Sequence, residues 1–109
     1  MTNKRKVLVV DGSKVVRASL IKQLSDRFEV RDEQNDESAW QTMVLDSAIV
    51  AVVSGIALDR DDGRGLLERL RDSKLSRLRN VPFLLMVSSS FTDADRQKAR
   101  KLGVSEFIV

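Results

Sequence analysis

Short apolar segments alternate with helical patterns along the chain, and this alternation limits the fold more than any other feature. The apolar, β-branched content predicts strands at residues 7–10, 28–31, 49–54, 83–87 and 106–109. Helical patterns lie between consecutive strands. Strands that alternate with helices in this way form a parallel sheet with helices on both faces and right-handed crossovers. The sequence therefore predicts one α/β domain over residues 1–109.

The predicted helices have recognisable starts and ends. Ser13 is a suitable N-cap for a helix that runs to about Asp26. Thr92 and Asp95 form a variant of the capping box at the start of the last helix, and Gly103 is suited to the position just after its end. Two further helices are expected around residues 39–44 and over residues 66–74.

Composition excludes several kinds of site. The chain has no cysteine and no histidine, so disulfides, thiolate- or imidazole-ligated zinc and Ser–His triads are impossible. The longest apolar run, residues 48–53, is far shorter than the roughly 20 residues of a membrane span. We therefore expect a cytoplasmic protein without membrane contact. The net charge of +3 comes from basic residues mixed with acidic ones, so no nucleic-acid binding is expected of this domain.

Polar residues follow three of the predicted strands. In an open parallel sheet, ligands bind at the carboxyl ends of the strands, near the switch in strand order. The residues at these ends are Asp11-Gly12-Ser13, Ser54-Gly55-Ile56 and Ser88-Ser89-Ser90.

The motifs at these strand ends resemble those of response-regulator receiver domains, especially the single-domain chemotaxis regulators of bacterial two-component signalling. Residues 7–17 read VLVVDGSKVVR, close to the family's VLVVDDS opening. Residues 53–71 read VSGIALDRDDGRGLLERLR, close to VSDI-x-MP-x-x-DG-x-x-LLE-x-LR. Residues 102–109 match the AGA-x-x-F-x-V stretch, and Ser88 stands where the family has Thr or Ser.

This resemblance covers essentially the whole chain and implies a flavodoxin-like fold. The expected fold is a doubly wound, five-stranded parallel sheet with strand order 2-1-3-4-5. It also implies that the family's last helix is missing from this chain, which should leave an apolar face uncovered. We expect an output domain beyond residue 109.

The resemblance also assigns roles to individual positions. Asp11 matches one member of the family's magnesium-binding acid pair, and Gly12 stands in place of the other. Gly55 stands in place of the phosphoacceptor aspartate, and Asp59 in place of a loop proline. The lysine that the family has immediately after its fifth strand would follow Val109. Phe107 falls at the position of the switch aromatic.

These departures predict a degenerate receiver. A phosphoryl acceptor must be a nucleophilic side chain, and glycine has none. Asp11 alone is at most a weak magnesium ligand, so we expect no metal, no cofactor and no enzymatic activity. The vestigial pocket would comprise Asp11, Gly12, Gly55 and Ser88. We expect a regulatory, phosphorylation-independent module of phosphorelay signalling that binds a protein partner, or a second copy, through the helix from Thr92 to Leu102 and the last strand.

Several alternatives remain open. Asp59 could act as a substitute acceptor in a working receiver. Asp11 could cap the first helix rather than hold a metal, Gly55 could mark a backbone bend, and Phe107 could be an ordinary core residue. A phosphatase of the haloacid-dehalogenase type would need an attacking aspartate at Val9. A flavin site would need a phosphate loop rich in Ser and Thr, which residues 12–16 do not supply.

Overall fold

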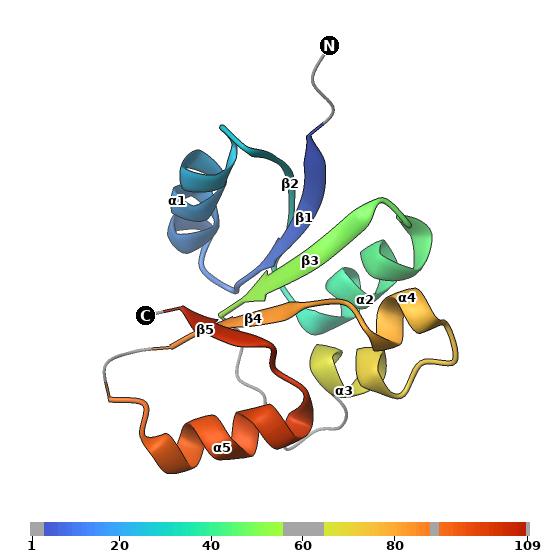
Figure 1. Cartoon of the computed structure of the whole chain (residues 1–109). Helices are drawn as coiled ribbons and strands as arrows, with labels where there is room; N and C mark the ends of the chain where they lie inside the picture. Colours follow the sequence, from blue (N-terminus) through green and yellow to red (C-terminus); the bar gives the residue numbers. More distant parts are fainter. Residues whose placement is uncertain (1–3, 56–64, 88–89, 109) are drawn as a thin grey trace.

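Five parallel strands form the centre of the structure, a computed structural model that describes residues 4–55, 65–87 and 90–108. The strands are β1 (Arg5–Val10), β2 (Phe28–Glu33), β3 (Ile49–Ser54), β4 (Phe83–Met86) and β5 (Glu106–Ile108). They pair in the order β2-β1-β3-β4-β5, and every pairing is parallel (Figure 1). The predicted α/β class and strand order are confirmed.

Helices cover both faces of this sheet unequally. They are α1 (Lys14–Leu24), α2 (Asp36–Leu45), α3 (Leu66–Arg71), α4 (Ser76–Arg79) and α5 (Asp93–Leu102). Figure 1 shows α1 on one side of the sheet and the other helices on the opposite side. Within the described residues, no helix is long and apolar enough to cross a membrane.

The larger core lies between the sheet and helices α2 to α5. Alternate residues of β1, β3 and β4 point into it, since side chains alternate between the two faces of a strand. Its members include Leu8, Val10, Ala39, Met43, Val52, Leu66, Leu67, Leu70, Leu78, Phe83, Leu85, Ala99 and Val104. These buried side chains fix the positions of the helices that follow the strand ends.

The face that packs on α1 is less completely covered. Val9 is fully buried there, but α1 itself has no fully buried residue. Ala51, Leu84 and Met86 remain half-buried, and Ile108 is exposed. The sheet therefore has one closed apolar layer and one that is partly open to solvent.

The predicted caps are present at both α1 and α5. The Ser13 hydroxyl accepts a hydrogen bond from the Val16 N–H at 3.3 Å. Thr92 and Asp95 form both bonds of a capping box, at 3.0 and 3.1 Å. Gly103 follows α5 with a left-handed φ of 111°, a conformation that favours glycine. The local chemistry at these helix ends thus agrees with the sequence.

The helix predicted over residues 66–74 is present but shorter. α3 ends at Arg71, and a separate helix that the sequence did not predict, α4, begins at Ser76. The Ser73 hydroxyl accepts from the Leu75 N–H at 3.1 Å. A serine side chain that bonds to a nearby backbone group competes with the helical hydrogen bonds, and this ends the helix.

Arg71 joins α3 to two segments that follow it. Its guanidinium donates to the carbonyls of Gly103, at 2.7 and 3.1 Å, and of Arg79 and Val81, at 2.9 and 2.7 Å. Burial lowers the pKa of this guanidinium from its usual value. Arg71 therefore ties α3 to the segments that lead into β4 and β5.

We expect Gly103→Ala to destabilise the protein. A Cβ at residue 103 would lie 2.7 Å from Nε and 2.9 Å from Cγ of Arg71, in a backbone conformation unfavourable for alanine. The free energy of unfolding, measured in urea, should fall by about 1–3 kcal/mol. Gly12→Ala is the control, because its Cβ would have only Gln34 O at 3.9 Å. Equal effects of the two substitutions would contradict the prediction.

We also expect Asp46 to contribute to acid sensitivity. The hydrogen bond from Lys6 at 2.8 Å, and then that from the Ala48 N–H at 3.0 Å, hold the Asp46 pKa below its usual 3.8. A lowered pKa means that the stabilisation is complete above the unfolded value and is lost as pH falls through the folded one. Asp46→Asn should therefore destabilise the protein near neutral pH, and the difference from the unchanged protein should shrink below pH 3.8. Asp26→Asn, at an exposed residue, is the control, and its free energy of unfolding in urea should stay close to that of the unchanged protein at both pH values.

Candidate functional site

Strand pairing brings Asp11 and Gly55 side by side at the carboxyl ends of β1 and β3. Val10 is the register partner of Ser54, so the next residues of each strand are neighbours. The Gly55 N–H donates to Val10 O at 2.9 Å, and the Asp11 N–H donates to Glu33 O at 3.2 Å. The two positions that the sequence predicted to share a pocket are therefore adjacent in the sheet.

The Asp11 carboxylate lies in the space that a side chain at residue 55 would need. A Cβ at Gly55 would be 2.1 Å from Asp11 Oδ2 and 3.2 Å from its Cγ. The first distance is far inside van der Waals contact. Asp11 Oδ1 accepts a hydrogen bond from the Ser13 N–H at 2.8 Å, which holds the carboxylate in this orientation. Glycine at residue 55 thus permits a close approach by its neighbour.

Met86 and Arg17 complete this arrangement, and the sequence did not identify either. Met86 Cε would lie 2.8 Å from a Cβ at residue 55. Arg17 donates from Nη1 to Asp11 O at 2.8 Å and from Nε to Asp32 Oδ2 at 2.9 Å. Arg17 lies one helical turn after the N-cap Ser13. This spacing could have indicated that its side chain reaches the strand ends.

The two glycines of the predicted pocket differ in their surroundings. Gly12 is exposed, and a Cβ there would meet only Gln34 O at the ordinary distance of 3.9 Å. A larger residue at position 12 would fit without rearrangement. At position 55 the Asp11 carboxylate would first have to move. Of these two glycines, only Gly55 lies where a neighbouring side chain occupies the space of a Cβ.

The side chains near this point do not fit a magnesium ion. Magnesium takes an octahedral shell of oxygens with near-ideal geometry. Asp11 offers a single carboxylate, one oxygen of which already accepts from Ser13, and residues 12 and 55 have no side-chain oxygen. No group of three or more acidic side chains that could hold a metal occurs in the described part of the chain.

Two predicted site residues, Ser88 and Asp59, lie outside the described residues. Their assignment as the hydroxyl of the vestigial pocket and as a substitute acceptor stays a prediction.

Ser54, next to Gly55, faces the layer of the sheet that packs on helices α2 to α5. It is buried and lines a pocket of about 290 Å³ with Leu67, Phe83 and Lys101, between α3 and α5. The same pocket includes Asp36, the buried first residue of α2, whose Oδ2 accepts from the Leu66 N–H at 3.1 Å. The helix predicted around residues 39–44 did not reach Asp36, so this link between α2 and α3 was missed.

Phe107 is part of a cation–aromatic cluster on α5 and β5. Its ring centroid is 5.8 Å from that of Phe91. The guanidinium carbons of Arg96 and Arg100 lie 5.7 and 5.3 Å from the Phe107 centroid. Arg96 Nε is buried and has no hydrogen-bond partner among the described residues. Phe107 also packs against the main core, so its role as a switch residue stays a prediction.

The contact between Asp11 and residue 55 predicts a coupled effect of substitution. Gly55→Ala should lower the free energy of unfolding by about 1–3 kcal/mol, because the new Cβ overlaps the Asp11 carboxylate. In an Asp11→Ala background the same change should cost at least about 1 kcal/mol less. Urea denaturation of the four proteins in this cycle gives the coupling energy. Strictly additive effects would show that Asp11 does not occupy the space above Gly55.

No protein-family model matches the sequence, and no curated protein matches it. Solved structures do match. Chemotaxis response regulator CheY4 of Vibrio cholerae has 19% identity and a TM-score of 0.81, with 98% of this chain and 87% of that chain covered. A putative response regulator from Chloroflexus aurantiacus has 20% identity and a TM-score of 0.80, with 97% and 84% covered. A response regulator protein from Burkholderia multivorans has 26% identity and a TM-score of 0.71, with 97% and 82% covered. The predicted resemblance is therefore confirmed, and the chain has the fold of response-regulator receiver domains.

Proposed function

We propose that this chain is a receiver-like module of two-component signalling that acts through protein contacts and without phosphorylation of residue 55. The observation that carries the proposal is the Asp11 carboxylate beside Gly55, where a Cβ would lie 2.1 Å from Oδ2. The position of the family's acceptor has no side chain, and a neighbouring group fills the space.

The chemistry of phosphoryl transfer supports the same conclusion. Transfer to a protein side chain needs a nucleophile, a metal that bridges the phosphoryl oxygens and a cation that stabilises the developing charge. Gly55 cannot be the nucleophile, and Asp11 is the one carboxylate that the described residues place there. The proposal therefore includes no catalysis, no cofactor and no dependence on magnesium. It also includes a cytoplasmic location, where two-component receivers meet their partners.

The proposed contact surface is α5 together with β5. Its centre is the cluster of Phe91, Arg96, Arg100 and Phe107. Arginine and aromatic side chains are the residues most often responsible for binding energy at protein interfaces. Leu102 and Ile108 are exposed on the same two elements. We propose that a protein partner, or a second copy of this chain, binds here.

Incubation with acetyl phosphate and magnesium tests the proposal directly. We expect no mass increase in intact-protein mass spectrometry and no change in the fluorescence of Trp40. Trp40 is the single tryptophan, so the signal has one source. Its ring centroid lies 4.6 Å from the guanidinium carbon of Arg69 on α3. Beryllofluoride, a phosphoryl mimic, should likewise leave the fluorescence unchanged.

A stoichiometric, base-labile adduct would overturn the proposal. Asp59→Asn and Asp11→Asn would then identify the acceptor. Loss of the adduct in the first variant alone would make the chain a working receiver with Asp59 as a substitute acceptor.

A further inference from the structure

Exposed apolar side chains gather at the end of the sheet opposite the candidate site. Leu45 and Leu75 are 85% and 53% exposed, and Val44 and Val50 are also exposed. These four are more than half of the seven large hydrophobic residues exposed in the described part of the chain. They come from the end of α2, the start of β3 and the residue before α4. Together with Arg77 and Arg79 we call them the distal surface.

Hydrogen bonds connect the parts of this surface. Arg77 donates from Nη1 to Met43 O at 2.8 Å and from Nη2 to Val44 O at 3.0 Å, which fixes α4 against the end of α2. The Arg79 N–H donates to Leu75 O at 3.0 Å. Its side chain returns to the turn before Leu75, where Nη1 is 3.3 Å from Ser73 O. The apolar and cationic side chains are thus neighbours on a structured part of the fold.

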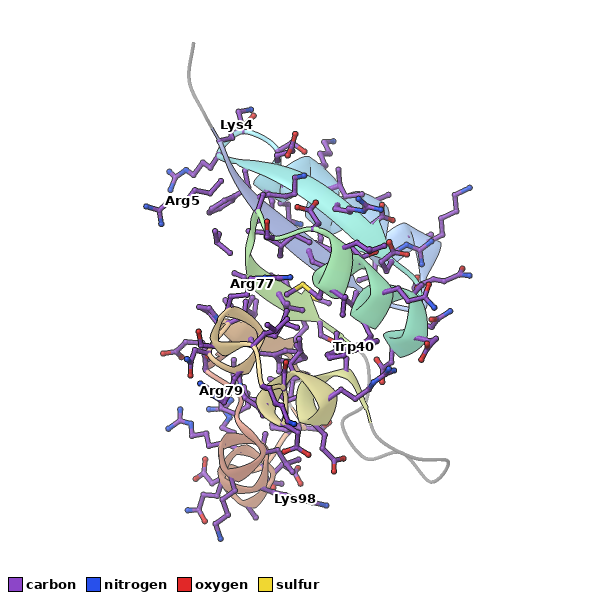
Figure 2. All side chains as sticks on the ribbon, turned by 90° about the vertical axis from the view of Figure 1, so that its right-hand side faces the viewer. Lys4, Arg5, Trp40, Arg77, Arg79 and Lys98 are labelled. Atoms are coloured by element: carbon purple, nitrogen blue, oxygen red, sulfur yellow. The ribbon has the colours of Figure 1, made fainter. Side chains whose placement is uncertain are left out.

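Among the described residues, the cations of the distal surface have no ion pair with a carboxylate. This holds for Arg77 and Arg79, whereas the nearby Lys6 pairs with both Glu29 and Asp46. Figure 2, which looks onto the side that lies at the right in Figure 1, shows Arg77 and Arg79 along its left-hand edge, with Lys4 and Arg5 above them. This side also carries α4 and the end of α2 (Figure 1). The surface therefore combines exposed apolar groups with uncompensated positive charge.

We propose that the distal surface binds an acidic amphipathic segment of a partner protein. The partner's apolar side chains would pack on Val44, Leu45 and Leu75, and its carboxylates would bind Arg77 and Arg79. Guanidinium groups bind carboxylates through paired hydrogen bonds. Arg77 is already held by two carbonyls, so little of its conformational freedom remains to be lost on binding.

Other occupants fit less well. Nucleic acid binds mainly through its phosphates, which leaves the exposed Leu45 and Leu75 without a role. An anionic membrane is bound by long flexible cations on an amphipathic face, whereas Arg77 and Arg79 are tied to backbone carbonyls. The proposal does not depend on the state of the candidate site, because the distal surface is at the opposite end of the sheet. Its failure would leave the proposed function unchanged.

The first test measures fluorescence anisotropy of a labelled synthetic helix of about 18 residues. The probe has leucines on one face and glutamates on the other. One control peptide has lysine in place of each glutamate, and another has serine in place of each leucine. We expect the acidic amphipathic peptide to bind at least about tenfold more tightly than either control. Equal affinity for all three, or no binding, would overturn the proposal.

The second test locates the peptide with charge-matched variants. Arg79→Glu combined with Leu45→Ser should weaken binding by about tenfold, because it removes one cation and one apolar contact. Lys14→Glu combined with Val15→Ser is the matched control, since both residues are exposed on α1 and Val15 is 79% exposed. The control should stay within about twofold of the unchanged protein. Thermal melting by circular dichroism verifies that both variants fold. Equal losses in both variants would contradict the assignment.

Amide NMR spectra and rival ligands supply the last test. Peptide-induced shifts confined to residues 44–50 and 73–79 would support the distal surface. Shifts confined to α5 and β5 would overturn it. So would tighter binding of single-stranded oligothymidylate or of phosphatidylglycerol vesicles than of the peptide. A dimer that Arg79→Glu with Leu45→Ser dissociates would assign the surface to a second copy and would also overturn the proposal.

Discussion

The parallel register between β1 and β3 is the constraint on which the candidate site depends. β1 lies between β2 and β3, and Leu8, Val9 and Val10 are fully buried. A shift by one residue would move each of these side chains to the other face of the sheet, so the register is strongly determined. The pairing of Val10 with Ser54 then places Asp11 next to Gly55. The geometry at the carboxyl ends of the strands is therefore set by the buried residues that precede them.

This register explains why one carboxylate at the strand ends is compatible with stable packing. Two acids this close would repel each other unless a cation lay between them. With glycine at residue 55, Asp11 instead turns over the backbone and bonds to the Ser13 N–H. Arg17 secures the Asp11 carbonyl and bonds to Asp32. The end of β1 is therefore held by a set of internal contacts that connect β1, β2 and α1.

Much of the fold could be predicted because the local signals are strong. The run Ile49–Ser54 agrees residue for residue with β3, and the capping box at Thr92 marks the start of α5. The failures have a different origin. The break between α3 and α4 depends on one hydroxyl, that of Ser73, and Asp36 begins α2 because Asn35 caps it. Side-chain bonds of this kind compete with helical periodicity, and neither has a long sequence pattern that would identify it.

The candidate site was predicted only as a set of positions. The family resemblance placed Asp11 and Gly55 together, but the direction of the Asp11 side chain depends on its hydrogen bond from the Ser13 N–H. The approach of residues far apart in the chain, such as Met86 to the space above Gly55, has no signal in a single sequence. The same limit applies to Arg17, whose partner Asp32 lies on β2.

Arginine bonds to backbone carbonyls connect the fold to the distal surface. Helices α3 and α4 have only six and four residues, so a large share of their backbone carbonyls lacks a helical partner. Arg71, Arg77 and Arg79 donate to carbonyls at or near the ends of these elements and of α2. Since these bonds use neutral acceptors, they satisfy the carbonyls and leave the positive charge without a counterion. The short helices between β3 and β4 therefore account for both the fixed position of these guanidinium groups and the charge of the surface on which Arg77 and Arg79 lie.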